Sequence, residues 1–409
     1  MQYKIFPPDK INATVKLPAS KSISNRALIL NALSLSSNPI ENLSDCEDTQ
    51  VIIDAFNSDS NVFDIKGAGT AMRFLTAFLA GMEGEWIIKG SPRMHERPIY
   101  PLVDTLLDLG AEIEYLEKEG FPPLKINGKK LEGGEVFLTG NISSQFTSAL
   151  LMIAPTMENG LIMHIDKEIV SKPYIHLTIK LMEEYGVYVK WEGNDIAVKP
   201  QTYTPTNIKV ESDWSAASYW YAMAALSSNA EITLLGLSKA SSQGDSKLAS
   251  IFDDLGVTTK FIPEGVTIKK AGKPTKKFFY NFIDEPDLVQ TFAVTCCLLN
   301  IPFLFSGVQS LKIKETDRVE ALKTELMKLG YVLKETDNEM LEWNGERLEF
   351  NAPATIDTYD DHRMALSFTP ASIKLGSIMI NDPKVVAKSY PHFWDDIKNA
   401  GFKIEEKNN

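Results

Sequence analysis

The sequence predicts a mixed α/β (α+β) protein with two pseudo-symmetric lobes, each made of three repeated α/β units. Two observations lead to this prediction. Five glycines follow amphipathic helix patterns at nearly equal spacing, and a second set of helix starts recurs in phase with them. The chain has 409 residues, which is enough for two or three domains, each with a sizeable core.

The first repeated pattern is a helix, a glycine and a strand. Its glycines lie between 70 and 76 residues apart and are Gly110, Gly186, Gly256, Gly330 and Gly401. Glycine often ends a helix because it adopts the left-handed backbone conformation without a steric penalty. Each segment therefore predicts a helix, its cap and an alternating strand.

The second pattern is a polar cluster that opens an apolar, alanine-rich helix, the second helix of each unit. These clusters lie near Thr70, Ser143, Asp213, Asp287 and Asp361. A sixth, Lys21–Leu28, precedes Thr70 by about 48 residues only. The sequence thus predicts six copies of one α/β unit, the first shortened between Asp48 and Gly67.

A stretch rich in Pro and Thr, Pro200–Thr206, lies near mid-chain and indicates a boundary between lobes. We expect one lobe to contain residues 14–211 and the other to contain residues 1–13 and 212–409.

Composition excludes several classes of protein. Hydrophobic residues make up 44% and charged residues 23%, which is typical of a globular protein. No apolar run is long enough for a transmembrane helix, and the N-terminus lacks a signal-peptide core. A net charge of −12 disfavours nucleic acid and anionic membranes as partners. Three cysteines cannot form a disulfide framework, so we expect a cytoplasmic protein.

Basic side chains recur beside the helix starts and in nearby loops. A helix N-terminus attracts anions through its free N–H groups and its dipole. In an acidic chain, such clustering predicts a small polyanionic ligand; ordinary capping with solvated cations is the alternative. The basic residues are Lys21, Arg26, Arg73, Arg93, Arg97, Lys314, Arg318, Arg363 and Lys388.

Other chemistries fit the sequence poorly. Lys21-Ser22 lacks the upstream glycines of a P-loop, and Gly67–Thr70 lacks the third glycine of a dinucleotide fingerprint. The five histidines show no zinc spacing, so we expect neither a metal nor a cofactor. Cys296-Cys297 lies in an apolar helix pattern and is expected to pack in the core.

Eight motifs in order give the chain a resemblance to the 5-enolpyruvylshikimate-3-phosphate synthases, a family of enolpyruvyl transferases. The likeness covers almost the whole sequence. The motifs are Leu17–Arg26, Gly67–Arg73, Pro92–Ile99, Ser143–Phe146, Val170–Tyr174, Ile313–Arg318, Asp361–Ala365 and Lys388–Pro391.

The resemblance implies two lobes of three units each, arranged like an inside-out α/β barrel, that close over an interlobe active site. It also implies a reaction of the shikimate pathway of aromatic amino acid biosynthesis, on the route to chorismate. The enolpyruvyl group of phosphoenolpyruvate moves to the 5-hydroxyl of shikimate 3-phosphate, through a tetrahedral intermediate, and phosphate is released. We expect a cytoplasmic monomer that needs no cofactor or metal. The family is the target of glyphosate, an inhibitor that Gly69 would admit, whereas Phe74 leaves the affinity for that inhibitor open.

The resemblance also assigns residues to the two substrates. Shikimate 3-phosphate would be bound by Lys21, Ser22, Arg26, Ser143, Ser144, Gln145, Ser171, Tyr174, Asp287, Ser310 and Lys314. Phosphoenolpyruvate would be bound by Lys21, Gly69, Arg97, Gln145, Arg318, Arg363 and Lys388. Arginine suits both ligands because its planar fork donates two parallel hydrogen bonds to a carboxylate or phosphate.

The family's catalytic residues correspond to Asp287, Glu315 and Lys21. Asp287 would accept the proton of the attacking hydroxyl, Glu315 would shuttle the proton at C3, and Lys21 would stabilise charge. From the residues alone, Asp287 could be a helix N-cap and Glu315 part of a surface ion-pair cluster.

Neighbouring polar residues have simpler interpretations. Ser143 and Ser144 could be plain caps, Asp213 is expected to be a cap and hinge residue, and His362 is expected to orient its neighbours.

The chain departs from the family pattern at Phe74, where proline is common, and at Ser310 and Gly67, where asparagine is frequent. Two other functions stay open as alternatives. One is a catalytically silent protein that binds phosphometabolites. The other is a transferase acting on a nucleotide sugar, which is disfavoured because no cysteine lies between Arg93 and Arg97.

Overall fold

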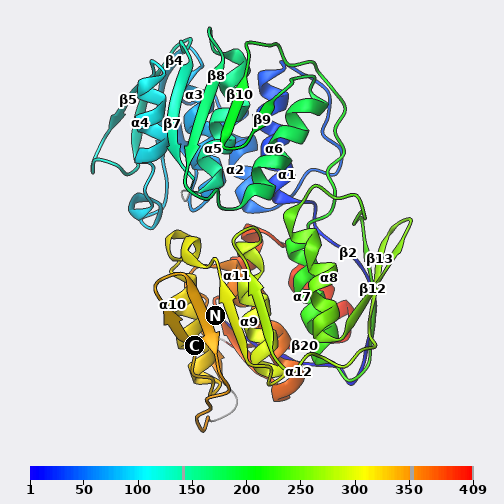
Figure 1. Cartoon of the computed structure of the whole chain (residues 1–409). Helices are drawn as coiled ribbons and strands as arrows, with labels where there is room; N and C mark the ends of the chain where they lie inside the picture. Colours follow the sequence, from blue (N-terminus) through cyan, green and yellow to red (C-terminus); the bar gives the residue numbers. More distant parts are fainter. Residues whose placement is uncertain (141–142, 351–353, 408–409) are drawn as a thin grey trace. The chain divides into compact units, whose positions relative to one another are not determined.

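The computed structural model describes residues 1–140, 143–350 and 354–407, which form two compact units. The first, here called the 19–210 unit, is Ala19–Val210. The second, called the 211–409 unit, combines Glu211–Asn409 with Met1–Pro18. Figure 1 labels the elements of both units.

In the 19–210 unit, the part that the structure describes forms two four-stranded sheets and the helices that cover them. Its helices are α1 (Lys21–Leu33), α2 (Glu47–Phe56), α3 (Gly69–Ala80), α4 (Tyr100–Asp108), α5 (Ser144–Ile153) and α6 (Lys172–Glu184), with 3-10 turns η1 (Met94–Glu96) and η2 (Ala154–Thr156). Its strands are β3 (Val62–Asp64), β4 (Gly84–Lys89), β5 (Glu112–Tyr115), β6 (Leu124–Gly128), β7 (Gly134–Thr139), β8 (Leu161–Asp166), β9 (Lys190–Glu192) and β10 (Asp195–Val198).

The described residues of the 211–409 unit form three four-stranded sheets. Its helices are α7 (Trp214–Leu226), α8 (Leu248–Ile251), α9 (Val289–Leu298), α10 (Arg318–Lys328), α11 (His362–Phe368), α12 (Ser372–Leu375) and α13 (Phe393–Asn399). Its 3-10 turns are η3 (Gly244–Lys247), η4 (Phe252–Leu255), η5 (Pro286–Leu288), η6 (Gln309–Ile313), η7 (Thr369–Ala371) and η8 (Pro383–Lys388). Its strands are β1 (Gln2–Phe6), β2 (Ile11–Lys16), β11 (Ala230–Leu235), β12 (Val257–Ile262), β13 (Gly265–Lys270), β14 (Phe278–Asn281), β15 (Phe303–Ser306), β16 (Lys334–Thr336), β17 (Met340–Trp343), β18 (Thr355–Ile356), β19 (Ile378–Asn381) and β20 (Lys403–Lys407).

All five sheets share one topology: a parallel pair of strands followed by two antiparallel pairings. In β3-β4-β6-β5, for example, β3 and β4 are parallel, and β6 is antiparallel to both β4 and β5. The order is β7-β8-β10-β9 in the second sheet and β14-β15-β17-β16 in the fourth. This recurrence confirms the predicted mixed α/β fold of repeated units, and none of the described sheets closes into a barrel.

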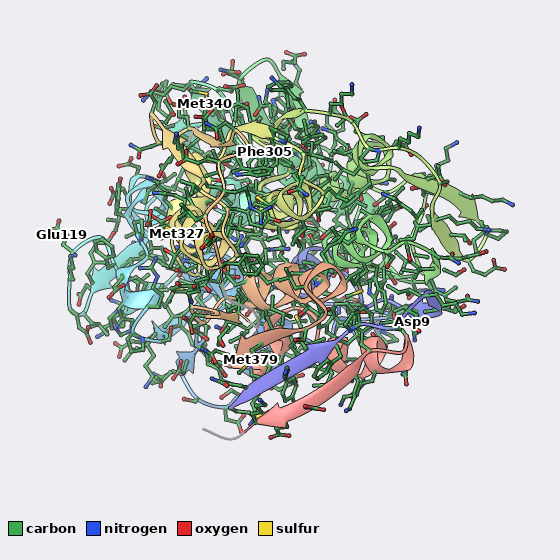
Figure 2. The ribbon with its side chains drawn as sticks, turned by 90° about the horizontal axis from the view of Figure 1, so that it is seen from below. Asp9, Glu119, Phe305, Met327, Met340 and Met379 are labelled. Atoms are coloured by element: carbon green, nitrogen blue, oxygen red, sulfur yellow. The ribbon has the colours of Figure 1, made fainter. Side chains whose placement is uncertain are left out.

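The two N-terminal strands complete sheets formed by residues far along the chain. Strand β2 pairs in parallel with β11, and β1 lies between β19 and β20. Figure 2 shows β1 beside β20, with Met379 labelled on β19, where it is paired with Lys4. This pairing explains why residues 1–18 belong to the 211–409 unit.

The predicted glycine caps are confirmed. All five repeat glycines have positive φ, between +80° and +100°. Before Gly256, however, the chain forms the short helix α8 and the 3-10 turn η4, where we predicted a longer regular helix.

Two details of the predicted repeat are wrong. The polar clusters open the first helix of each unit rather than the second, because periodicity gives the spacing but not the starting point. The first unit is not a shortened α/β unit either. Its helices α1 and α2 have no sheet among the described residues, since the preceding strand β2 pairs with β11, and only a bridge joins Glu41 to Lys209.

Helices α3, α7 and α9 lie in the core. In α7 every residue except Ser215 is buried, and α3 and α9 are buried over nearly their whole length. Helices that are apolar all round must be covered on every side, so the amphipathic sheets take the outer positions. The pair Cys296-Cys297 is fully buried in α9, as predicted.

Candidate active site

The 211–409 unit gathers three carboxylates around one buried arginine. Arg318 is the first residue of α10, and its side chain is 2% exposed. Its Nη1 lies 3.0 Å from Asp287 Oδ1, its Nη2 lies 2.8 Å from Glu315 Oε2, and its Nε lies 2.8 Å from Asp361 Oδ2. Two of these carboxylates are the predicted proton carriers, and one guanidinium fixes the position of both.

A second arginine holds the other oxygen of Asp287. Arg363 Nη2 lies 2.7 Å from Asp287 Oδ2, and its Nη1 donates to the hydroxyl of Tyr219 at 3.2 Å. Asp361 caps α11, where Oδ1 accepts from the backbone N–H of Arg363 at 2.9 Å. Asp361 therefore fixes the backbone of Arg363, and the side chain of Arg363 extends to Asp287.

These charges determine the protonation of the cluster. Burial alone would raise the pKa of Asp287, but the charges of Arg363, Lys314 and Arg318 outweigh it and hold that pKa well below its usual range. Burial opposes the charge of Arg318, yet Asp361, Glu315 and Asp287 raise its pKa above the ordinary value. Asp287 is therefore ionised at neutral pH and able to accept a proton.

The two alternative interpretations of the carboxylates are wrong. Asp287 lies inside η5 rather than at the N-cap of η5 or α9, which are Glu285 and Leu288, and its carboxylate accepts from arginines. The Glu315–Arg318 pair is no surface cluster, because the arginine is buried. Asp213 does cap α7, as predicted, with Oδ1 accepting from Ala216 at 2.9 Å.

The remaining predicted residues of this unit lie near the ends of 3-10 turns. Ser310 is half-buried in η6, and Lys314 directly follows that turn. Lys388 ends η8, where its Nζ lies 2.6 Å from Asp360 Oδ1.

In the 19–210 unit, the predicted catalytic lysine opens helix α1. Lys21 Nζ lies 2.9 Å from Asp48 Oδ2, and the two side chains are 15% and 9% exposed. Asp48 lies in the first turn of α2, so the ion pair joins the starts of two helices. An acidic residue in a first helical turn is ordinary, so Asp48 carries no separate signal in the sequence.

Arg26 is buried inside the same unit and hydrogen-bonded to three helices. Its Nε donates to Thr178 at 2.7 Å, its Nη1 to the carbonyl of Ser22 at 2.9 Å, and its Nη2 to Ser148 at 3.1 Å. Burial lowers its pKa to about 10, against the opposing effect of Tyr174. Its guanidinium carbon also lies 5.2 Å from the ring centre of Phe74, so this departure from the family pattern provides a cation–π surface.

Gly69 begins α3 directly against the guanidinium of Arg97. A Cβ atom at Gly69 would lie 2.7 Å from both Nη1 and Nη2 of that arginine. Arg97 is 5% exposed and follows η1, and Arg73 donates to the carbonyl of Gly69 at 3.3 Å. The absent side chain therefore leaves room for the arginine rather than only for a ligand.

The remaining predicted residues lie at two further helix starts. Ser143 caps α5, and its hydroxyl accepts from Gln145 N at 3.4 Å, while the amide of Gln145 donates to Thr70 at 3.4 Å. Ser171 precedes α6 with a left-handed backbone (φ 57°) and is buried. Ser143 is thus a cap, as one interpretation had it, and Ser144 is the first residue of the helix.

The structure places these predicted residues in two sets, one in each unit. Ten lie in the 19–210 unit, at the starts of α1, α3, α5 and α6 and after η1, and the rest lie around Arg318 or at η6 and η8. Three features were not predicted from the sequence: the ion pair of Asp48 with Lys21, the ion pair of Asp361 with Arg318, and the burial of Asp245. Among the described residues, no three His, Cys, Asp or Glu side chains are grouped as metal ligands. None of the described helices has the length and hydropathy needed to cross a bilayer.

Comparison with known proteins identifies similar chains along the full length. A family model described as EPSP synthase (3-phosphoshikimate 1-carboxyvinyltransferase) matches residues 5–58 and 53–397. A 3-phosphoshikimate 1-carboxyvinyltransferase of Bacteroides fragilis (strain YCH46) is 54% identical over 406 residues, covering 99% of each chain. One from Colwellia psychrerythraea is 37% identical over 427 residues, covering 97% of this chain and 98% of the relative. A solved EPSP synthase from Acinetobacter baumannii has a TM-score of 0.79 at 21% sequence identity, and the match covers 99% of this chain and 100% of the solved chain. At this identity the likeness shows the fold alone.

Proposed function

The chain belongs to the EPSP synthase (3-phosphoshikimate 1-carboxyvinyltransferase) family, and we propose that the two residue sets described above carry out that enzyme's reaction. The enzyme transfers the enolpyruvyl group of phosphoenolpyruvate to the 5-hydroxyl of shikimate 3-phosphate and releases phosphate. This step belongs to aromatic amino acid biosynthesis.

One observation carries the assignment of roles: Arg318 holds Asp287 and Glu315 at 3.0 and 2.8 Å. Addition and elimination each need a proton to move, and two carboxylates kept at a fixed separation can serve both steps. A protein that only binds phosphometabolites has no need for such a pair.

The proton movements follow from the charges. As the hydroxyl oxygen of shikimate 3-phosphate bonds to C2 of phosphoenolpyruvate, its proton passes to Asp287, which is ionised. The C3 methylene gains a proton to complete the tetrahedral intermediate. Phosphate then leaves C2 while C3 gives a proton back, and we assign this shuttle at C3 to Glu315. Lys21 would stabilise the charge that develops on the phosphoenolpyruvate oxygens.

The other predicted residues would bind and orient the anions. We assign shikimate 3-phosphate to the serines and Gln145 at the helix starts of the 19–210 unit, with Arg26, Tyr174, Ser310 and Lys314. Phosphoenolpyruvate is assigned to Lys21, Gly69, Gln145 and the cations Arg97, Arg318, Arg363 and Lys388. Free N–H groups at helix starts favour such anions electrostatically.

The test is phosphate release from purified protein given shikimate 3-phosphate and phosphoenolpyruvate in the presence of a chelator. Release that requires both substrates supports the transferase. Release with a uridine diphosphate amino sugar, and none with shikimate 3-phosphate, would favour the nucleotide-sugar alternative. Tight binding of both ligands without release would favour a silent binding protein.

We further propose that the enzyme acts in the cytoplasm as a monomer. The three cysteines are free and buried, which suits a reducing compartment. Sedimentation equilibrium of the purified protein at micromolar concentration tests this proposal, because a dimer would give twice the molar mass of one chain.

A further inference from the structure

A buried carboxyl group lies near the catalytic cluster and has no role in the reaction above. Asp245 belongs to η3 and is 3% exposed. Its Oδ2 accepts a hydrogen bond from the hydroxyl of Ser215, the one residue of α7 that is not fully buried. Its Oδ1 is buried and accepts no hydrogen bond from any residue that the structure describes. Burying a carboxyl oxygen without a hydrogen-bond partner costs folding free energy, so the presence of this group in the core needs an explanation.

The segment that carries Asp245 is fixed at both ends. Before it, the side chain of Gln243 accepts from the N–H of Trp214 at 3.1 Å and donates to the carbonyl of Ser212 at 2.8 Å. After it, Lys247 Nζ lies 2.6 Å from Glu285 Oε1, two residues before Asp287. The turn η3 thus joins the start of α7 to the segment that presents the proton acceptor.

Several charged and titratable groups face Asp245 from the elements packed around it. They are Asp213 at the start of α7, Asp287 in η5, Arg363 in α11 and Tyr280 in β14, beside the hydrogen-bond donor Ser215. Burial and the negative charge of Asp287 raise the pKa of Asp245 to about 7, against the hydrogen bond from Ser215 and the charge of Arg363. Asp245 therefore exchanges its proton in the neutral range, unlike Asp287.

We propose that Asp245 is a positioning residue for the proton acceptor, and that its carboxyl competes with Asp287 for the positive charge of Arg363. The proposal rests on the function assigned to Asp287 above. It concerns neither substrate directly, since Asp245 acts only through the Asp287–Arg363 pair, whose Oδ2–Nη2 distance is 2.7 Å.

The direction of the effect follows from reciprocity. Asp287 raises the pKa of Asp245, so an ionised Asp245 must raise the pKa of Asp287 by the same amount. A more basic Asp287 takes the hydroxyl proton more readily. Turnover should therefore rise as Asp245 ionises, by roughly 3- to 10-fold, because proton transfer recovers only part of a change in basicity. The same negative charge weakens the hold of Arg363 on an anion, so KM for phosphoenolpyruvate should rise as well.

The test compares pH profiles of kcat for wild type, Asp245→Asn and Ser215→Ala between pH 5.5 and 9. In wild type we expect a rise of kcat centred near pH 7. Asp245→Asn carries no charge at any pH and should lose this rise, staying at the level of wild type at low pH. Ser215→Ala removes a hydrogen bond that favours the ionised carboxyl, so it should move the rise to higher pH without abolishing it.

A control variant separates this role from structural support. Glu325 is also fully buried, and its Oε1 accepts a hydrogen bond from the hydroxyl of Tyr359 at 2.5 Å. It lies near the end of α10 that is opposite Arg318. Glu325→Gln should leave the midpoint of the kcat rise in place. If Asp245→Asn keeps the wild-type rise, or if Ser215→Ala leaves its midpoint unchanged, the inference is wrong although the transferase stands. A wild type that releases no phosphate would overturn both.

Discussion

Replacing Gly69 by alanine should weaken the binding of phosphoenolpyruvate by displacing Arg97. The added Cβ would lie 2.7 Å from both terminal nitrogens of that guanidinium, and ordinary contact begins near 3.4 Å. The arginine must therefore retreat by about 0.7 Å. Helix α3 itself is not strained by the change, because alanine is favourable inside a helix.

The size of the effect follows from what Arg97 is proposed to do. A charge-assisted hydrogen bond contributes about 1.5–3 kcal/mol, and a shift of this size spoils its length and angle. We expect KM for phosphoenolpyruvate to rise roughly 10- to 150-fold, with a much smaller change in KM for shikimate 3-phosphate. An inhibitor that mimics phosphoenolpyruvate, such as glyphosate, should lose affinity for the same reason.

Initial rates of phosphate release, with phosphoenolpyruvate varied at saturating shikimate 3-phosphate, measure this effect. Gly81→Ala is the matched control, because it changes the other end of α3 and its Cβ would come no closer than 3.7 Å to another residue. A double-mutant cycle with Arg97→Met adds a stricter requirement. The two changes should be strongly non-additive, since the second removes the group that the first displaces. Additive effects, or a KM within twofold of wild type for Gly69→Ala, would refute the reasoning.

Three further predictions concern the 211–409 unit. Glu315→Gln should lower kcat by roughly 10²–10⁴-fold, while calorimetry should show nearly unchanged binding of both substrates. If the variant instead loses affinity and keeps normal turnover, Glu315 is a binding residue. Arg318→Met should lower the free energy of unfolding in urea by about 3–5 kcal/mol, because the buried carboxylate of Asp361 loses its arginine partner. Lys388→Met should lower it by less than about 1 kcal/mol, and equal losses for the two variants would contradict this. The raised pKa of Asp245 means that the folded chain keeps a proton that the unfolded chain releases between about pH 4 and 7, so stability falls as pH rises through that window. Asp245→Asn should therefore be more stable than wild type at pH 8 by roughly 1–4 kcal/mol, and the difference should vanish near pH 4; a difference independent of pH would contradict this assignment.

The repeat was predictable because it depends on local chemistry. A glycine that ends a helix must adopt positive φ whatever surrounds it, and the five repeat glycines do so. Where strands pair was not predictable in the same way. Strand β2 precedes α1 in the chain yet pairs with β11, more than two hundred residues later, and no local pattern records that choice. The first unit consequently lacks a sheet among the described residues.

The proposed catalytic carboxylates show a similar division. Their presence followed from motifs, but the motifs left Asp287 between an N-cap and a proton acceptor. The structure decides against the cap because both carboxylate oxygens accept from arginines, at 3.0 and 2.7 Å. Asp245 gave no such signal, because burial and not residue type makes it unusual. A carboxylate in a turn is ordinary in a sequence and becomes notable only when the fold removes it from water.

The hydrogen bonds of the buried arginines limit how they can act on a ligand. A guanidinium has five N–H donors, and the motifs suggested that Arg26 and Arg318 present a planar fork to an anion. In each, the bonds to the protein use Nε, both donors of Nη2 and one of Nη1. The bonds to described residues leave one N–H of Nη1, so neither arginine can form two hydrogen bonds to a carboxylate or phosphate unless it first releases one of these partners. For Arg318 that partner would be Asp287 or Glu315, the two proposed proton carriers, or Asp361, whose Oδ1 lies 3.4 Å from Nη2. If the proposed binding of phosphoenolpyruvate at Arg318 releases Asp287 or Glu315, the released carboxylate becomes more basic, and substrate binding is then coupled to proton transfer.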